Sequence, residues 1–108
     1  MITPEIAVKR LQSIADHAAA GSFALVETQA KLLAEDLGRA SRPVYPNYKA
    51  NRGGQAPTWD AHHQRYAAAL PHVKSLHVRA AHSDSAGIVE SIDKARAALA
   101  PQVKEAAE

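Results

Sequence analysis

The chain has no cysteine, few aromatic residues (one Trp, three Tyr and one Phe) and no long apolar run. Without cysteine it can form neither a disulfide nor a catalytic thiolate. No stretch approaches the ~18 uninterrupted apolar residues of a membrane span. The first residues also lack the charged start and apolar run of a signal peptide. We therefore expect a soluble protein, cytoplasmic or part of a virion, that is not secreted by a signal peptide.

Large apolar residues are scarce as well. Leucine, isoleucine, valine and phenylalanine together number 21, whereas alanine alone numbers 24. The share of these 21 large apolar residues among the 108 is close to the ~20% below which chains are often disordered. The small net charge of +2, however, does not fit a disordered chain. The composition predicts one helical domain over 1–108 with a thin core. Such cores are commonly completed by self-association or by a partner.

The spacings that metal and catalytic sites require are also missing. The six histidines form no HxxxH or HExxH pattern, and His72, His77 and His82 are each five residues apart, about 140° around a helix. There is no GxSxG or SxxK motif, and 51-NRGGQ-55 does not match a phosphate-binding loop. We expect no enzymatic activity, no cofactor and no metal. His63 and His77 fall on an apolar stripe, which predicts neutral, hydrogen-bonded imidazoles at the edge of the core or, alternatively, pH-responsive contacts.

The first part of the chain predicts a helical hairpin over 4–40. Thr3 is a good N-cap, Pro4 suits a first helical position, and Gly21 suits the end of the helix. The apolar positions of the two helices are Ala7, Leu11, Ile14 and Ala18, then Phe23, Val26, Ala30, Leu33 and Leu37. The second set has coiled-coil spacing, and the very short connection favours antiparallel packing. Leu25 and Leu32 form a further stripe, which predicts that this helix contacts two neighbours.

The second part predicts a kinked or split helix over 58–81 and a C-terminal helix over 84–100. Thr58 is a plausible N-cap, and the apolar stripe continues across Pro71, where a helix loses a hydrogen bond. The positions of this stripe are Trp59, His63, Tyr66, Leu70, Val73 and His77. The cluster 82-HSDS-85 offers caps for the last helix. The fold class is therefore all-α, a small bundle of four to five helices.

Positive charge is concentrated in the middle of the chain. Residues 39–82 carry seven Lys or Arg against a single acid, Asp60, whereas 1–38 and 83–108 each carry three basic and five acidic residues. The middle segment also holds five of the six histidines. This asymmetry indicates either an anionic partner surface or neutralisation of the acidic ends, within the chain or in a sister subunit.

The irregular loop 41-SRPVYPNYKANRGGQAP-57 lies in this basic middle. It is far longer than the usual connection of ~4–6 residues, and loops of such length are usually functional or disordered. Pro43 and Pro46 favour an extended first half, whereas Gly53 and Gly54 allow backbone angles closed to other residues. We interpret the loop as an extended arm, with Trp59 and Tyr66 anchoring it to the following helix.

Three roles remain open for the loop. In the first, Tyr45 and Tyr48 fill pockets on a protein partner, and the basic residues pair with its acids. In the second, the tyrosines stack on unpaired bases and the basic segment 39–82 meets phosphates. In the third, the loop folds back and completes its own core. The residues expected to contact a protein partner are Arg42, Tyr45, Tyr48, Lys49 and Arg52, and nucleic acid would use the same set with Arg65, Lys74 and Arg79.

We favour the protein partner, because the net charge is small and the alanine-rich helices suit close packing against other subunits. The sequence thus predicts a non-enzymatic structural or assembly protein, acting through self-association or protein partners. A nucleic-acid-binding regulator is the second choice, and no membrane partner is expected. Connector and head-completion subunits of virions are an analogy of architecture alone.

Overall fold

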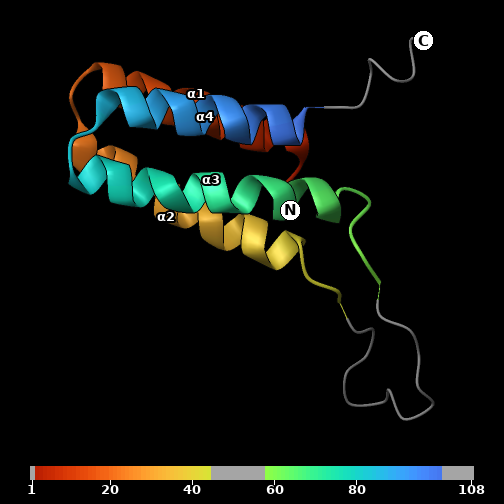
Figure 1. Ribbon diagram of the computed structural model, residues 1–108. Coiled ribbons are helices and arrows are strands. Elements are labelled where there is room, and N and C mark those ends of the chain that lie inside the picture. Colours follow the sequence, from red (N-terminus) through yellow and green to blue (C-terminus); the bar gives the residue numbers. More distant parts are fainter. Residues whose placement is uncertain (1, 45–57, 101–108) are drawn as a thin grey trace, which may run out of the picture.

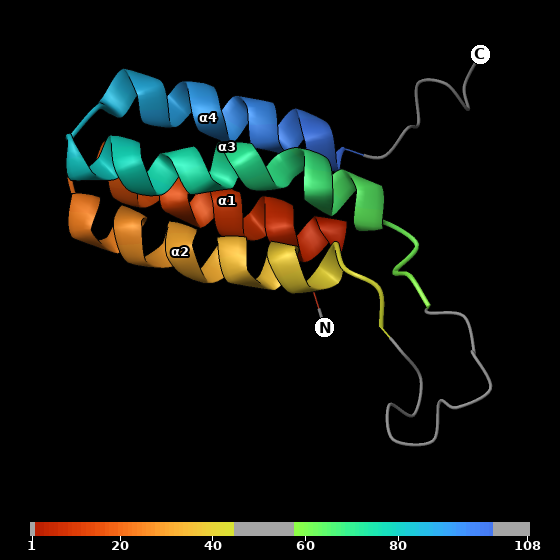
Figure 2. The same ribbon diagram turned by 60° about the horizontal axis from the view of Figure 1, so that its bottom comes forward.

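The computed structural model describes residues 2–44 and 58–100. Four helices, α1 (Pro4–Ala19), α2 (Phe23–Ala40), α3 (His63–Ala81) and α4 (Ser85–Leu99), alternate in direction along one bundle (Figure 1). Each packs against the next, and α4 closes the ring against α1, so that α2 and α4 occupy opposite corners (Figure 2). The predicted all-α small bundle is confirmed. Among the described residues, no helix is both long enough and apolar enough to cross a membrane.

The turn between α1 and α2 follows directly from the sequence. Thr3 caps α1, because its Oγ1 accepts a hydrogen bond from the Ile6 N–H at 3.2 Å. Gly21 has a left-handed φ of 77°, and the Ser22 N–H donates to the His17 carbonyl at 2.9 Å. A left-handed residue followed by this backward hydrogen bond stops a helix and reverses the chain. The predicted hairpin over 4–40 is therefore present.

The turn between α3 and α4 has the same geometry, but with a serine at its centre. Ser83 has a φ of 54°, and the Asp84 N–H donates to the Arg79 carbonyl at 2.9 Å. Asp84 then caps α4 by accepting from the Gly87 N–H at 2.9 Å. Both short turns lie at the same end of the bundle, so the start of α1, the end of α2, the start of α3 and the end of α4 lie at the other end (Figure 1).

The core runs along the bundle axis and contains many small side chains. Six of its buried apolar residues are alanines, and the largest side chain in it is Tyr66. The buried apolar residues are Ala7, Leu11, Ile14, Ala18, Val26, Ala30, Leu33, Leu37, Tyr66, Ala69, Val73, Leu76, Ala80, Ile88, Ile92, Ala95 and Leu99. The stripes predicted for the first and second helices are in this set, except for Phe23, which packs at its edge.

The start of the third helix differs from the prediction. α3 begins at His63 instead of residue 58, because Thr58 pairs with Val44 and does not act as a cap. The carboxylate of Asp60 accepts from the His62 N–H at 2.8 Å, and the Asp60 carbonyl accepts from the His63 N–H at 3.0 Å. Of the two alternatives predicted at Pro71, a kink or a split, the split is absent, because α3 is a single helix across this residue. Pro71 has no N–H to donate to the carbonyl of Ala67, four residues earlier. Both residues are exposed.

Two predicted apolar stripes match the core only in part or not at all: the α3 stripe reaches it through Tyr66 and Val73, and the α2 stripe of Leu25 and Leu32 lies outside it. On α3 the fully buried positions include Ala69 and Leu76, whereas Leu70 and His77 lie at the boundary with α2. The reason is that α3 packs against both α2 and α4, so its buried face lies between these two neighbours. On α2, Leu25 and Leu32 are each 46% exposed. α2 does contact two helices, but not through these two leucines.

Candidate partner-binding site at the loop base

The structure describes both ends of the predicted loop, which we call the loop base (residues 42–44 and 58–60). Val44 and Thr58 exchange two backbone hydrogen bonds of 2.7 Å each, and Thr58 Oγ1 donates a third to the Val44 carbonyl at 3.1 Å. The two ends of the loop are therefore held side by side. Of the residues predicted to contact a partner, Arg42 lies in the loop base, and the others, Tyr45, Tyr48, Lys49 and Arg52, lie outside the described residues.

A pocket of about 770 Å³ lies beside the loop base, against α1 and α2. Its lining residues are Ile2, Ile6, Arg10, Asp36, Arg39, Ala40, Arg42, Val44, Thr58, Trp59 and Asp60. The apolar part is unusually accessible: Ile6, Val44 and Trp59 are 43%, 58% and 51% exposed. Exposed apolar surface with a charged border is typical of binding sites. We call this hollow the loop-base pocket.

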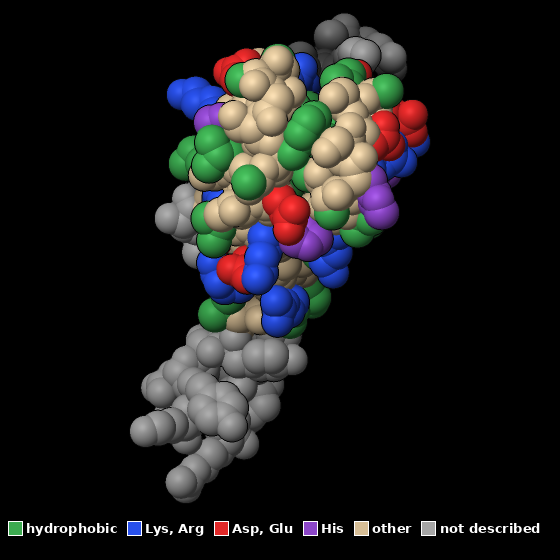
Figure 3. All heavy atoms as spheres, turned by 90° about the vertical axis from the view of Figure 1, so that its left-hand side faces the viewer, with side chains coloured by type: hydrophobic (Ala, Val, Ile, Leu, Met, Phe, Trp, Pro, Cys, Tyr) green, Lys and Arg blue, Asp and Glu red, His purple; other side chains and the backbone are tan. Residues whose placement is uncertain are grey.

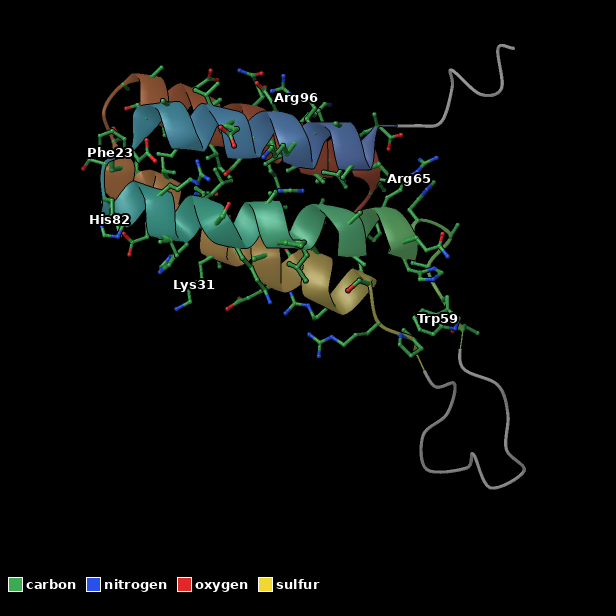
Figure 4. All side chains as sticks on the ribbon, in the orientation of Figure 1. Phe23, Lys31, Trp59, Arg65, His82 and Arg96 are labelled. Atoms are coloured by element: carbon green, nitrogen blue, oxygen red, sulfur yellow. The ribbon has the colours of Figure 1, made fainter. Side chains whose placement is uncertain are left out.

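Trp59 is held in place by α3. Its ring lies 4.6 Å from the His63 ring, centroid to centroid, with a tilt of 38°, and His63 Nδ1 is hydrogen-bonded to the Asp60 carbonyl at 2.9 Å. The predicted anchoring of Trp59 to the third helix is therefore seen, with the indole beyond the end of the bundle (Figure 4). The hydrogen bond predicted for His63 is present as well.

Tyr66 has a different role from the one predicted. It is fully buried, and its hydroxyl donates to the Ile2 carbonyl at 3.2 Å, which ties the start of the chain to α3. Burial is the main reason that the pKa of Tyr66 is raised above its usual value. Ile2 also lines the loop-base pocket, so Tyr66 supports one wall of the pocket from inside the core.

The charged side of the pocket is a network between α1 and α2. Asp36 accepts a hydrogen bond from Arg10 at 2.5 Å and is also paired with Arg39. The hydrogen bond from Arg10 is the largest cause of a lowered pKa for Asp36, and the charges of both arginines lower it further. Nothing in the sequence pattern of α2 alone shows that Arg10 faces Asp36.

Arg42 stands between two hollows. Its Nε donates to the Gly38 carbonyl at 2.9 Å, which satisfies a carbonyl at the end of α2. The side chain lines both the loop-base pocket and a second hollow between α2 and α3. Within the described residues Arg42 has no carboxylate partner, so its guanidinium can pair with an acid on another molecule.

The other basic residues of the middle segment point in different directions. Lys74 lines the hollow between α2 and α3, whereas the Arg79 guanidinium reaches over Gly87 of α4. Arg65 lies near His62, 3.4 Å from its Nδ1, at the end of the bundle that carries the loop base (Figure 4). These charges do not form one continuous basic face on α3.

The histidines do not assemble a metal site in the part of the chain that the structure describes. No group of three or more potential ligands occurs there. His77 Nε2 lies 3.9 Å from a Glu27 carboxylate oxygen, and its buried Nδ1 has no hydrogen-bond partner among residues 2–44 and 58–100. The hydrogen-bonded His77 predicted from the sequence is therefore not observed.

Comparisons with protein-family models, with curated proteins and with solved structures found no match to this chain. Its class is defined by its own architecture. It is a four-helix bundle with alternating helix directions and a long α2–α3 connection whose two ends are paired beside an exposed pocket.

Proposed function

We propose that the protein is a non-enzymatic structural or assembly subunit that binds a protein partner at the loop base. The observation that carries this proposal is the exposure of Trp59, Val44 and Ile6 around one pocket that also presents Arg42. Tryptophan and arginine are the residue types that most often dominate binding energy at protein interfaces. Covering these side chains removes apolar surface from water, at about 25 cal/mol per Å².

The loop extends this contact. The thirteen residues between the paired Val44 and Thr58 include Tyr45, Tyr48, Lys49 and Arg52. Because Val44 and Thr58 line the pocket, this segment is joined to the bundle beside the pocket at both ends. We assign these four residues to the same interface as the pocket. The setting that we propose for such a subunit is the cytoplasm or a virion, and its likeness to connector and head-completion proteins is an analogy of architecture alone.

Two observations favour a protein partner over nucleic acid. The net charge is only +2, and Lys74 and Arg79 lie against different neighbours of α3. Proteins that bind nucleic acid usually gather many basic residues on one face. If the protein were instead a nucleic-acid-binding regulator that uses 39–82, its affinity for nucleic acid would fall steeply with salt. Binding to nucleic acid is therefore measured at several salt concentrations beside the partner-binding experiments.

The test is capture of the tagged chain with its partner from its native host, followed by binding measurements with the purified partner. Trp59→Ala is expected to weaken binding by at least about 2 kcal/mol, the usual threshold for a dominant interface residue. Leu25→Ala is the matched control, because Leu25 is similarly exposed but lies near the other end of the bundle. Equal binding by both variants, or purification of nucleic acid alone, would refute the proposal.

A further inference from the structure

A groove of about 760 Å³ runs between α2 and α3, on a different side of the bundle from the outer face of α4. Its floor includes Ala30, Ala34 and Leu70, and its border carries the exposed side chains of Lys31, Arg42 and Lys74. Glu35 is the one acid among the groove residues, so the border is net positive. Figure 4 shows Lys31 pointing away from the bundle, and in Figure 3 Lys and Arg side chains gather in the lower half of the end view.

The outer face of α4 has complementary properties. Ala86, Val89, Asp93 and Ala97 are exposed and recur at spacings of three and four, so they share one side of the helix. Val89 is 54% exposed. Asp93 has no salt-bridge partner among the described residues, whereas the neighbouring Glu90 pairs with Lys94 at 3.0 Å. This face therefore presents exposed alanine and valine side chains together with a carboxylate, Asp93, that is unpaired among the described residues.

We propose that the α2–α3 groove of one copy receives the outer face of α4 from a second copy. A helix that lays small apolar side chains into an apolar groove is a common recognition mode, and here the charges on the two surfaces are opposite. Because α2 and α4 lie at opposite corners, one chain cannot fill its own groove. The contact therefore joins two different surfaces, and repeating it gives a ring or a filament. This inference does not depend on the loop-base site.

The first measurement is sedimentation velocity of the full chain over a range of concentrations at two salt levels. We expect a mass above the 11.5 kDa monomer that grows with concentration at ~50 mM salt and falls at ~500 mM salt. A monomer at every concentration in low salt overturns the proposal. That result is also the one expected if an acidic partner protein, and not a second copy, occupies the groove.

The second measurement uses two variants, each altered on one surface. Lys31→Glu with Lys74→Glu changes the groove, and Val89→Gln with Asp93→Gln changes the α4 face; all four positions are exposed. Each variant alone is expected to be monomeric, because self-association needs both surfaces. An equimolar mixture is expected to form a 1:1 dimer and nothing larger, because one intact groove then meets one intact α4 face.

The controls separate this contact from the loop base. Lys9→Glu reverses an exposed charge on α1 and is expected to associate like the unaltered chain. Trp59→Ala is also expected to self-associate normally. Circular dichroism checks that every variant keeps its helices. The inference is overturned if the mixture stays monomeric, if either surface variant associates like the unaltered chain, or if Trp59→Ala alone abolishes association.

Discussion

Val44 and Thr58 are fourteen residues apart in sequence but are paired by two backbone hydrogen bonds of 2.7 Å. This pair of residues lies outside the helical core, where both line the loop-base pocket together with Trp59. The position of the pocket wall therefore depends on a local pairing that the bundle itself does not require. Stability of the bundle and order at the loop base are expected to be separable.

Thr58→Pro tests this separation. Proline removes the N–H that donates to Val44 and also the hydroxyl, so the Val44 amide is expected to exchange its hydrogen at least about tenfold faster. Melting is expected to change little, because Thr58 is exposed. Thr58→Val is the matched control, which loses only the Oγ1 bond. Unchanged exchange of the Val44 amide in Thr58→Pro contradicts the pairing.

Ser83→Gly is expected to stabilise the protein. Ser83 adopts a left-handed backbone with φ of 54°, a conformation that costs an ordinary residue about 1 kcal/mol and glycine almost nothing. Gly21 occupies the equivalent position in the other short turn, so Gly21→Ser is expected to lower stability by a similar amount. Urea unfolding of both variants measures the two changes. A loss of stability in Ser83→Gly is the opposite result.

The Asp36 network predicts sensitivity to acid. Because the folded-state pKa of Asp36 is lowered, its contribution is present above the unfolded value of about 3.9 and is lost as the pH falls through the folded pKa. Asp36→Asn is expected to cost about 0.5–1 kcal/mol at pH 7, since Asp36 and Arg10 remain 31% and 27% exposed. The difference is expected to shrink as the pH falls below about 3.9 and to vanish once Asp36 is protonated in the folded state. Glu35→Gln, on the adjacent exposed residue, serves as the control, and a cost that does not shrink as the pH falls excludes the ion pair as its cause.

Pro71→Ala is expected to stabilise α3. An internal helical proline costs up to ~3 kcal/mol, and alanine restores the N–H that the exposed Ala67 carbonyl lacks. We expect a gain of about 1–3 kcal/mol in the free energy of unfolding, measured in urea. A decrease instead means that the shape which Pro71 gives α3 is needed for its packing on α2 and α4.

Local signals in the sequence predicted most of the fold. Thr3, Pro4 and Gly21 mark the ends of α1 through short-range chemistry, and helical periodicity predicted most of the buried residues. The start of α3 was wrong because the partner of Thr58 is Val44, and no local rule shows a pairing across fourteen residues. Apolar spacing also placed Leu25 on a contact surface, although spacing alone does not show which side of a helix has a neighbour.

The candidate site was predicted only in part. Composition drew attention to Arg42 and Trp59, which both line the loop-base pocket. The pocket also needs Ile6 from α1 and Asp36 from α2, which meet the loop base only in the folded bundle. The pairing of Arg10 with Asp36 depends on the register between two helices. Such contacts are set by tertiary packing, which helical periodicity does not specify.

The central claim is that a protein partner covers the loop base, and Trp59 reports on it directly because it is the single tryptophan of the chain. With 5-fluorotryptophan incorporated into this chain alone, the ¹⁹F resonance of Trp59 is measured free and in complex with the captured partner. The account predicts that the ¹⁹F resonance shifts when the partner binds, because the half-exposed indole becomes buried. It also predicts that the difference in this resonance between H₂O and D₂O disappears in the complex. An unchanged resonance in a fully formed complex would contradict it.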